Sequence, residues 1–271
     1  MLREKMVEHH VQHHAHKPHE FRWRSREISR LEGLSDAIFG FAVTLLIVAL
    51  EVPKTSEELF ETMRGFVSFG LTFAILYLFW YRQFVFFRRY GLEDGVTVAL
   101  NGVLLFVVLF FVFPLKFLIG AMVDWLLWGK RTVHLPDGTV ERIIRPENFA
   151  GMLAIYSLGF AAVFGIFTLL YLHAHRRRHE LELNELERLD TLQAIQTFGS
   201  AAGLVLLTPL YGLVSVLVKG KPYEDQAVLA ASAVLVGSIF LVMRLRLKRR
   251  RRRRELVKRI LASAEDSPLQ S

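Results

Sequence analysis

The sequence predicts an all-α integral membrane protein with six transmembrane helices and both termini in the cytoplasm. Hydrophobic residues make up 52% of the 271 residues and occur in long blocks, with the charged residues between the blocks. A helix that crosses a bilayer needs about 20 mainly apolar residues, and six blocks approach or exceed that length. A soluble fold has no use for several such blocks in one chain.

The six expected spans differ in the polar residues that they contain. The fourth and sixth have no charged residue, whereas the third contains Asn101 and Pro114 and the fifth contains Pro209. The spans are residues 34–52, 65–87, 96–119, 149–172, 192–218 and 226–243. They divide the chain into a basic, His-rich N-terminal segment (1–30), a membrane domain (31–246) and an Arg-rich tail (247–271).

Lys and Arg are distributed unevenly over the loops and termini. With both termini inside, the inner regions hold 24 of these residues and the outer loops hold eight. Because positive residues concentrate on the cytoplasmic side of membrane proteins, this threefold bias predicts cytoplasmic N- and C-termini.

The formal net charge of +8 belongs to the C-terminal tail. From Arg244 onward there are 11 basic residues against three acidic ones, so the rest of the chain is neutral overall. A basic run directly after an apolar span favours binding to anionic lipid head groups, and no nucleic-acid partner is expected. The residues concerned are Arg249, Arg250, Arg251, Arg252, Arg253 and Arg254.

Motifs of several enzyme and metal-binding classes are missing from the sequence. There is no Cys, which excludes a disulfide scaffold and a cysteine-ligated metal. There is no P-loop, no G-x-S-x-G, no H-E-x-x-H and no Gly-rich dinucleotide loop. We therefore expect no enzymatic activity, no cofactor and no built metal site. Six N-terminal histidines permit metal binding, but a solvated tail explains them as well.

Polar residues near the inner ends of the first three spans are candidates for function. Carboxylates inside a membrane are costly and are usually paired or functional. Ser35 and Asp36 either cap the beginning of the first helix or contact an ion, and Arg30 is a candidate partner for Asp36. Trp80 and Asn101 either hold the first helix through these two residues or lie at the same depth without a shared network.

The first span also has a stripe of apolar residues with helical spacing, namely Ile38, Phe41, Leu45 and Val48. Such a stripe marks one helical face. It serves lipid contact or helix packing, or it lines a pore that apolar rings close by dewetting. Thr44 lies on nearly the same face and has a hydroxyl group for a passing cation.

Two loops have their own local signals. Residues 132–140 contain Pro-Asp-Gly between β-branched residues, which predicts a small hairpin. Residues 180–190 alternate acidic residues with leucines, which predicts a helical extension into the cytoplasm.

The beginning of the first span resembles a known signature. Residues 30–36, RLEGLSD, are similar to the R-x-x-x-F-S-D motif of the transmembrane protein 175 family of endosomal and lysosomal potassium channels, which has six-helix prokaryotic members. Trp80 fits the tryptophan of the family's second helix, and Asn101 with Pro114 fits its third helix. The resemblance is most specific over 30–53 and 80–114, and the second half agrees in helix count only.

This resemblance implies that the first helix lines a central pore in a homotetramer and that the membrane domain is a channel domain. The hydrophobic constriction then falls at Phe41, with further layers at Leu45 and Val48 and with Thr44 beside them. The resemblance also implies a network that holds the first helix, formed by Arg30, Ser35, Asp36, Trp80 and Asn101. In three places the chain departs from the family pattern: Leu34 replaces a Phe, Gln83 a His and Phe41 an isoleucine.

The leading hypothesis is a leak-type, potassium-permeable cation channel in a prokaryotic plasma membrane. One alternative is a proton or cation pathway in which Asp36 titrates. The other is a non-conducting membrane scaffold whose basic tail binds lipid.

Overall fold

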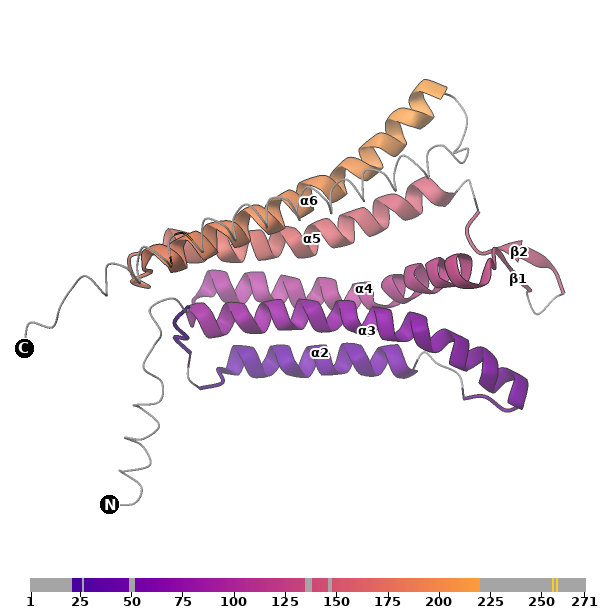
Figure 1. Ribbon diagram of the computed structural model, residues 1–271, viewed down its shortest axis with the longest axis horizontal. Helices are drawn as coiled ribbons and strands as arrows, with labels where there is room; N and C mark the ends of the chain where they lie inside the picture. The colour runs from indigo at the N-terminus through magenta and orange to yellow at the C-terminus, as the bar shows by residue number, and fades with distance from the viewer. Residues whose placement is uncertain are drawn as a thin grey trace, which may run out of the picture.

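The computed structural model describes residues 21–25, 27–48, 52–134, 138–145 and 148–219, together with Glu255 and Val257. In these ranges the chain forms long helices and one small hairpin (Figure 1). The elements are α2 (Arg30–Val48), α3 (Ser56–Tyr90), α4 (Gly95–Trp128), β1 (Thr132–His134), β2 (Val140–Arg142), α5 (Phe149–Arg176) and α6 (Glu185–Lys219).

Short polar residues and glycines determine where the helices begin and end. Thr55 caps α3, because its hydroxyl oxygen accepts from the Glu58 N–H at 3.1 Å. Asp94 caps α4 in the same way through the Thr97 N–H at 2.8 Å. Both helices end at a glycine with positive φ, 58° at Gly91 and 62° at Gly129, a conformation that costs glycine little.

Four helices in the described ranges are long and apolar enough to cross a membrane: α2, α3, α4 and residues 151–176 of α5. α2, with 19 residues, is about 28 Å long at 1.5 Å per residue, close to the thickness of a hydrocarbon core. α3 extends beyond the expected span because polar end turns continue the helix without adding hydropathy. α4 begins within one residue of its expected span and extends beyond it through the mostly apolar residues 120–128. α6 includes the expected fifth span, and the expected sixth (226–243) lies outside the described residues.

Of the two loop predictions, one is confirmed and the other is wrong in its first half. β1 and β2 pair antiparallel, with Val133 opposite Glu141, as the turn signal in 132–140 indicates. Residues 177–184 form a turn instead of a helix, and α6 begins only at Glu185. The chain reverses there through Glu182, which has a φ of 46°, so a continuous helix over 180–190 is excluded.

The helices pack in the order α2 and α3 on α4, α4 on α5, and α5 on α6. α4 supplies many of the fully buried side chains, including Leu104, Val112 and Leu115. α4 and α5 approach closely where a side chain on Gly159 would overlap the ring of Phe111. α2 lies at one edge of this arrangement (Figure 1), so one of its faces has no partner within the described chain.

Candidate functional site

The first turn of α2 is closed by a reciprocal pair of hydrogen bonds. The Glu32 N–H donates to Ser29 Oγ at 3.1 Å, and the Ser29 N–H donates to Glu32 Oε2 at 3.0 Å. This is the arrangement of a capping box. The interpretation of Ser35 and Asp36 as capping residues is therefore wrong, since the helix begins at Arg30 and both residues lie in its second turn.

Three buried polar side chains, one each from α2, α3 and α4, meet near the N-terminal end of α2. Ser35, Gln83 and Asn101 are each at most 2% exposed. Gln83 Nε2 donates to Ser35 Oγ at 3.1 Å and also to Asn101 Oδ1. Asn101 Nδ2 donates to Ser35 Oγ at 2.9 Å, and that hydroxyl donates to the Leu31 carbonyl at 2.7 Å. A hydroxyl has one donor and two acceptor sites, so all the hydrogen-bonding capacity of Ser35 is used.

A second contact ties α2 to α3 on the more exposed side. Trp80 Nε1 donates to Asp36 Oδ1 at 2.7 Å, and the Trp80 ring stacks on Phe84 with centroids 5.7 Å apart. Arg30 is exposed and, among the described side chains, has no hydrogen bond or ion pair with Asp36 or another residue. The structure therefore brings together four of the five expected anchoring residues, in two separate contacts.

Gln83 is the member of this cluster that sequence reasoning missed. The sequence marks it only as a departure from a family pattern, yet its amide makes two of the three side-chain contacts in the buried cluster. The available signal was a polar amide three residues after Trp80 in an apolar helix. Such a residue most often hydrogen-bonds to another helix.

The two faces of α2 have opposite environments. Phe39, Ala42 and Leu46 are buried against the rest of the chain. On the opposite face Phe41 is 53% and Val48 is 73% exposed. Because successive residues turn by 100°, Phe41, Thr44 and Val48 lie within about 60° of each other on the helix circumference.

The other two residues of the predicted constriction, Thr44 and Leu45, lie on or beside the exposed face of α2. Thr44 is exposed, and its hydroxyl donates to the Gly40 carbonyl of its own helix at 3.0 Å. Leu45 is half-buried at the edge of the exposed face. One chain therefore presents an apolar strip with a hydroxyl group beside it. Such a strip lines a pathway only when several copies of α2 face a common axis.

A charged cluster joins the N-terminal end of α4 to the C-terminal end of α5, with Asp94 just before α4. The carboxylate of Asp94 lies 2.6 Å from His173 Nε2 and 3.1 Å from Arg177 Nη2. Burial acts to raise the pKa of Asp94, but hydrogen bonds from Thr97 and His173 outweigh it. The pKa therefore falls from its ordinary value of 3.8 to about 2.

Comparison with known proteins identifies the relatives of this arrangement. Residues 30–112, which include α2, α3 and half of α4, match the family described as endosomal/lysosomal potassium channel TMEM175. A potassium channel of Marivirga tractuosa is 34% identical over 198 residues, which cover 73% of this chain and 78% of the relative. A potassium channel of Chamaesiphon minutus is 28% identical over 96 residues, which cover 32% of this chain and 47% of that protein.

Solved structures agree with the sequence comparison. The crystal structure of a variant of the potassium channel MtTMEM175, in complex with a nanobody fusion protein, superposes with a TM-score of 0.71 at 28% identity. The match covers 84% of this chain and 95% of that chain. On the strength of the identity to the Marivirga relative and the length that it covers, the chain belongs to the TMEM175 family.

Proposed function

We propose that this chain forms a potassium-permeable cation channel of the leak type, with a hydrophobic constriction contributed by α2 in a symmetric tetramer. The relatives with which it aligns are named potassium channels. Four apolar helices suited to a bilayer are consistent with a multi-pass membrane protein that transports ions.

The observation that carries this proposal is the asymmetry of α2. One face is held by the buried cluster of Ser35, Gln83 and Asn101, and the other presents Phe41 and Val48 without a partner among the described residues. A helix that served only to fill the core would not require two hydrogen bonds from neighbouring helices to one serine. The contacts fix the rotation of α2 about its axis and so keep Phe41 pointing away from its own chain.

Four copies of α2 around an axis would bring four Phe41 rings together. A ring of apolar side chains excludes water from a narrow pore and thereby raises the barrier to ions. Aromatic faces attract cations by up to about 2 kcal/mol when water is removed. Phe41 therefore supplies both the barrier and a preference for cations, and Thr44 adds a hydroxyl one turn further along.

Purified protein in liposomes tests the proposal by potassium flux. Phe41→Ala should raise the flux several-fold and weaken the preference for potassium over sodium, because the narrowest ring widens. Phe106→Ala is the matched control, since Phe106 is also exposed, at 70%, but lies on α4. A wild-type protein without flux, or equal flux in Phe41→Ala and wild type, contradicts the proposal. Native mass of the detergent complex checks for four subunits.

The proposal includes the placement of the chain in the membrane and the role of its tail. The Lys and Arg bias supports cytoplasmic termini, and the uncharged apolar run 226–243 supports a sixth helix. The proposed location is a prokaryotic plasma membrane. The run Arg249 to Arg254 lies outside the described residues, and its charge supports binding to anionic head groups. Removing 247–271 should weaken binding of the protein to anionic vesicles while leaving potassium flux in place. A full-length protein that binds these vesicles through its tail but carries no potassium would favour the scaffold alternative.

A further inference from the structure

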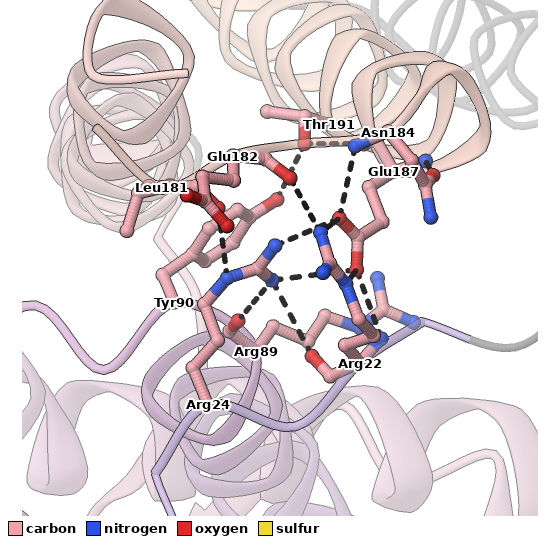
Figure 2. A network of polar contacts seen from close by, with 9 residues as sticks. All are labelled: Arg22, Arg24, Arg89, Tyr90, Leu181, Glu182, Asn184, Glu187 and Thr191. Carbon is pink, nitrogen blue, oxygen red and sulfur yellow. Dashed lines mark hydrogen bonds and ion pairs between the residues drawn. The ribbon is translucent and has the colours of Figure 1, made fainter. Parts of the chain in front are cut away.

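Part of the N-terminal segment lies across the inner end of the helices. We name residues 21–25 and 27–29 the strap. Phe21 is buried against Tyr90 with ring centroids 5.5 Å apart, and the Arg24 N–H donates to the Arg88 carbonyl at 3.0 Å. Figure 2 shows Arg22 and Arg24 between the end of α3 and the turn that joins α5 to α6. This part of the segment is a packed element of the fold.

A fully buried carboxylate receives the two strap arginines. Glu187, in the first turn of α6, is 0% exposed. Its Oε2 accepts from Arg24 Nη2 at 2.8 Å and from Arg22 Nη2 at 3.3 Å, and its Oε1 accepts from the Arg22 N–H at 3.0 Å (Figure 2). The same carboxylate accepts from the Asn184 N–H at 3.2 Å and so closes the capping box of α6.

The same two guanidinium groups also bind backbone carbonyls on both sides of the strap. Arg24 Nε donates to the Leu181 carbonyl at 3.1 Å, and its Nη1 donates to the Arg89 carbonyl at 3.0 Å. Arg22 donates to the Glu182 carbonyl. One set of donors therefore joins the end of α3 to the turn between α5 and α6 (Figure 2).

The strap continues directly into α2. Arg88 Nη1 donates to the Ser25 carbonyl at 3.2 Å, and Arg88 Nε lies 3.8 Å from Glu32 Oε1. Ser29 and Glu32 then form the capping box that begins α2. A path of polar contacts thus runs from Glu187 through Arg24 and the strap to the first turn of α2.

This ion cluster behaves as a unit because Glu187 is buried. Removing one partner of a buried ion pair leaves a charge without compensation, which costs far more than losing an exposed pair. Burial acts to raise the pKa of Glu187, and the hydrogen bonds from Arg24 and Arg22 outweigh it, so the pKa lies below its ordinary value. The carboxylate is therefore charged at neutral pH and holds both arginines.

We propose that Glu187 is a positioning residue for ion conduction: with Arg22 and Arg24 it clamps the strap and so fixes the inner end of α2 relative to α5 and α6. Glu187 does not touch the ion pathway. The clamp sets the fraction of time in which α2 has its conducting position, whereas Phe41 sets the barrier within it. This inference rests on the proposed channel function.

The first test removes the charge and keeps the helix cap. In Glu187→Gln the amide oxygen still accepts from the Asn184 N–H, but the ion pairs are lost. Single-channel recording in bilayers should show open probability reduced about tenfold, a typical size for coupling through a positioning contact. Unitary current and potassium selectivity should not change. Glu185→Gln is the matched control, because Glu185 is exposed on the same helical turn.

The second test links the strap to the end of α3 by a disulfide, which can be formed and reduced in the same protein sample. The chain has no native Cys, and a Cβ placed on Gly91 lies 3.7 Å from Arg24 Cβ, close to the 3.8 Å typical of disulfides. The double variant Arg24→Cys, Gly91→Cys should have low open probability when reduced. It should recover when oxidised, because the disulfide ties the strap to the end of α3, where Tyr90 contacts Tyr171 of α5 and Thr191 of α6. Each single variant is a control, and Gly91→Cys also measures the strain at a φ of 58°.

The outcomes separate this proposal from the channel function. Wild-type protein that carries no potassium would overturn both. Wild-type flux with an unchanged open probability in Glu187→Gln would overturn the clamp alone. A reduced double variant that conducts like wild type, or an oxidised one that stays as inactive as the reduced protein, would also overturn the clamp alone. If Glu187→Gln does not fold, the double variant decides by itself.

Discussion

Asn101 Nδ2 donates a hydrogen bond to Ser35 Oγ at 2.9 Å, between α4 and α2, where neither side chain is more than 2% exposed. In a membrane interior no water is available to replace this contact. The pair therefore holds α2 on α4 at one fixed rotation, which keeps Phe41 on the free face.

Ser35→Ala should destabilise the protein by about 1–2 kcal/mol. The substitution removes the hydroxyl that accepts from both Gln83 and Asn101, so two buried amide donors lose a partner. Thermal unfolding in detergent, followed by the fluorescence of the four tryptophans, measures the change.

Ser68→Ala is the matched control for this prediction. Ser68 is also a serine in a long apolar helix, but its hydroxyl donates to the Gly65 carbonyl of its own helix at 2.8 Å. Its removal should change the unfolding temperature little. Equal shifts in the two variants would mean that the contacts between helices at Ser35 add nothing to stability.

Trp80→Phe should cost less, about 0.5–1 kcal/mol. The phenylalanine retains the stacking on Phe84 and loses only the indole N–H that donates to Asp36 at 2.7 Å. Asp36 is exposed, so water can hydrogen-bond to its carboxylate once the indole donor is gone. Unfolding in detergent again measures the effect, and a loss as large as that of Ser35→Ala would contradict this ranking of the two contacts.

Asp36→Asn separates the channel from the titrating pathway. The asparagine oxygen can still accept from Trp80, whereas the side chain no longer binds or releases a proton. Potassium flux should therefore persist at near wild-type rates with the same pH dependence between pH 5 and pH 8. Abolished flux, or a pH dependence that disappears in the variant, would support the alternative in which Asp36 carries protons.

The positions of the helices could be predicted from the sequence to a large extent, because hydropathy and length are local properties. The described helices α2 to α5 cover most of the expected spans, and the hairpin follows from its turn residues. Hydropathy predicts the beginning of α3 nine residues too late, because Thr55 caps turns that are not apolar. It predicts the beginning of α4 to within one residue. Capping depends on one side chain, and an average of hydropathy over many residues does not detect it.

The tertiary contacts of polar residues were harder to predict. The sequence indicates Trp80 and Asn101 as candidates for holding the first helix through Ser35 and Asp36. Spacing alone does not predict which residues pair, and it leaves a shared network and independent positions equally open. Gln83 was not assigned to the cluster, and the strap contact of Arg24 with Glu187 joins residues 163 positions apart. Such pairs depend on how the helices pack against each other, which cannot be predicted from a single sequence.

The charge of Asp94 should stabilise the contact between the N-terminal end of α4 and the C-terminal end of α5. Asp94→Asn keeps an effective N-cap but removes the charge that faces His173 at 2.6 Å and Arg177 at 3.1 Å. We expect a loss of about 1 kcal/mol at pH 7. Glu93→Gln is the control, because Glu93 is the exposed neighbour and should have little effect.

The pH dependence of this loss follows from the direction of the pKa shift. The pKa of Asp94 is about 2 in the folded protein against an ordinary value of 3.8. Between these values the unfolded chain binds more protons, so the stabilisation is fully present above about pH 4 and is lost as the pH falls towards 2. Unfolding curves at pH 7, 5, 4 and 3 should show a constant difference between wild type and Asp94→Asn down to pH 4 and a smaller one at pH 3. A difference that instead widens on acidification would show that His173, and not the carboxylate, controls the cluster.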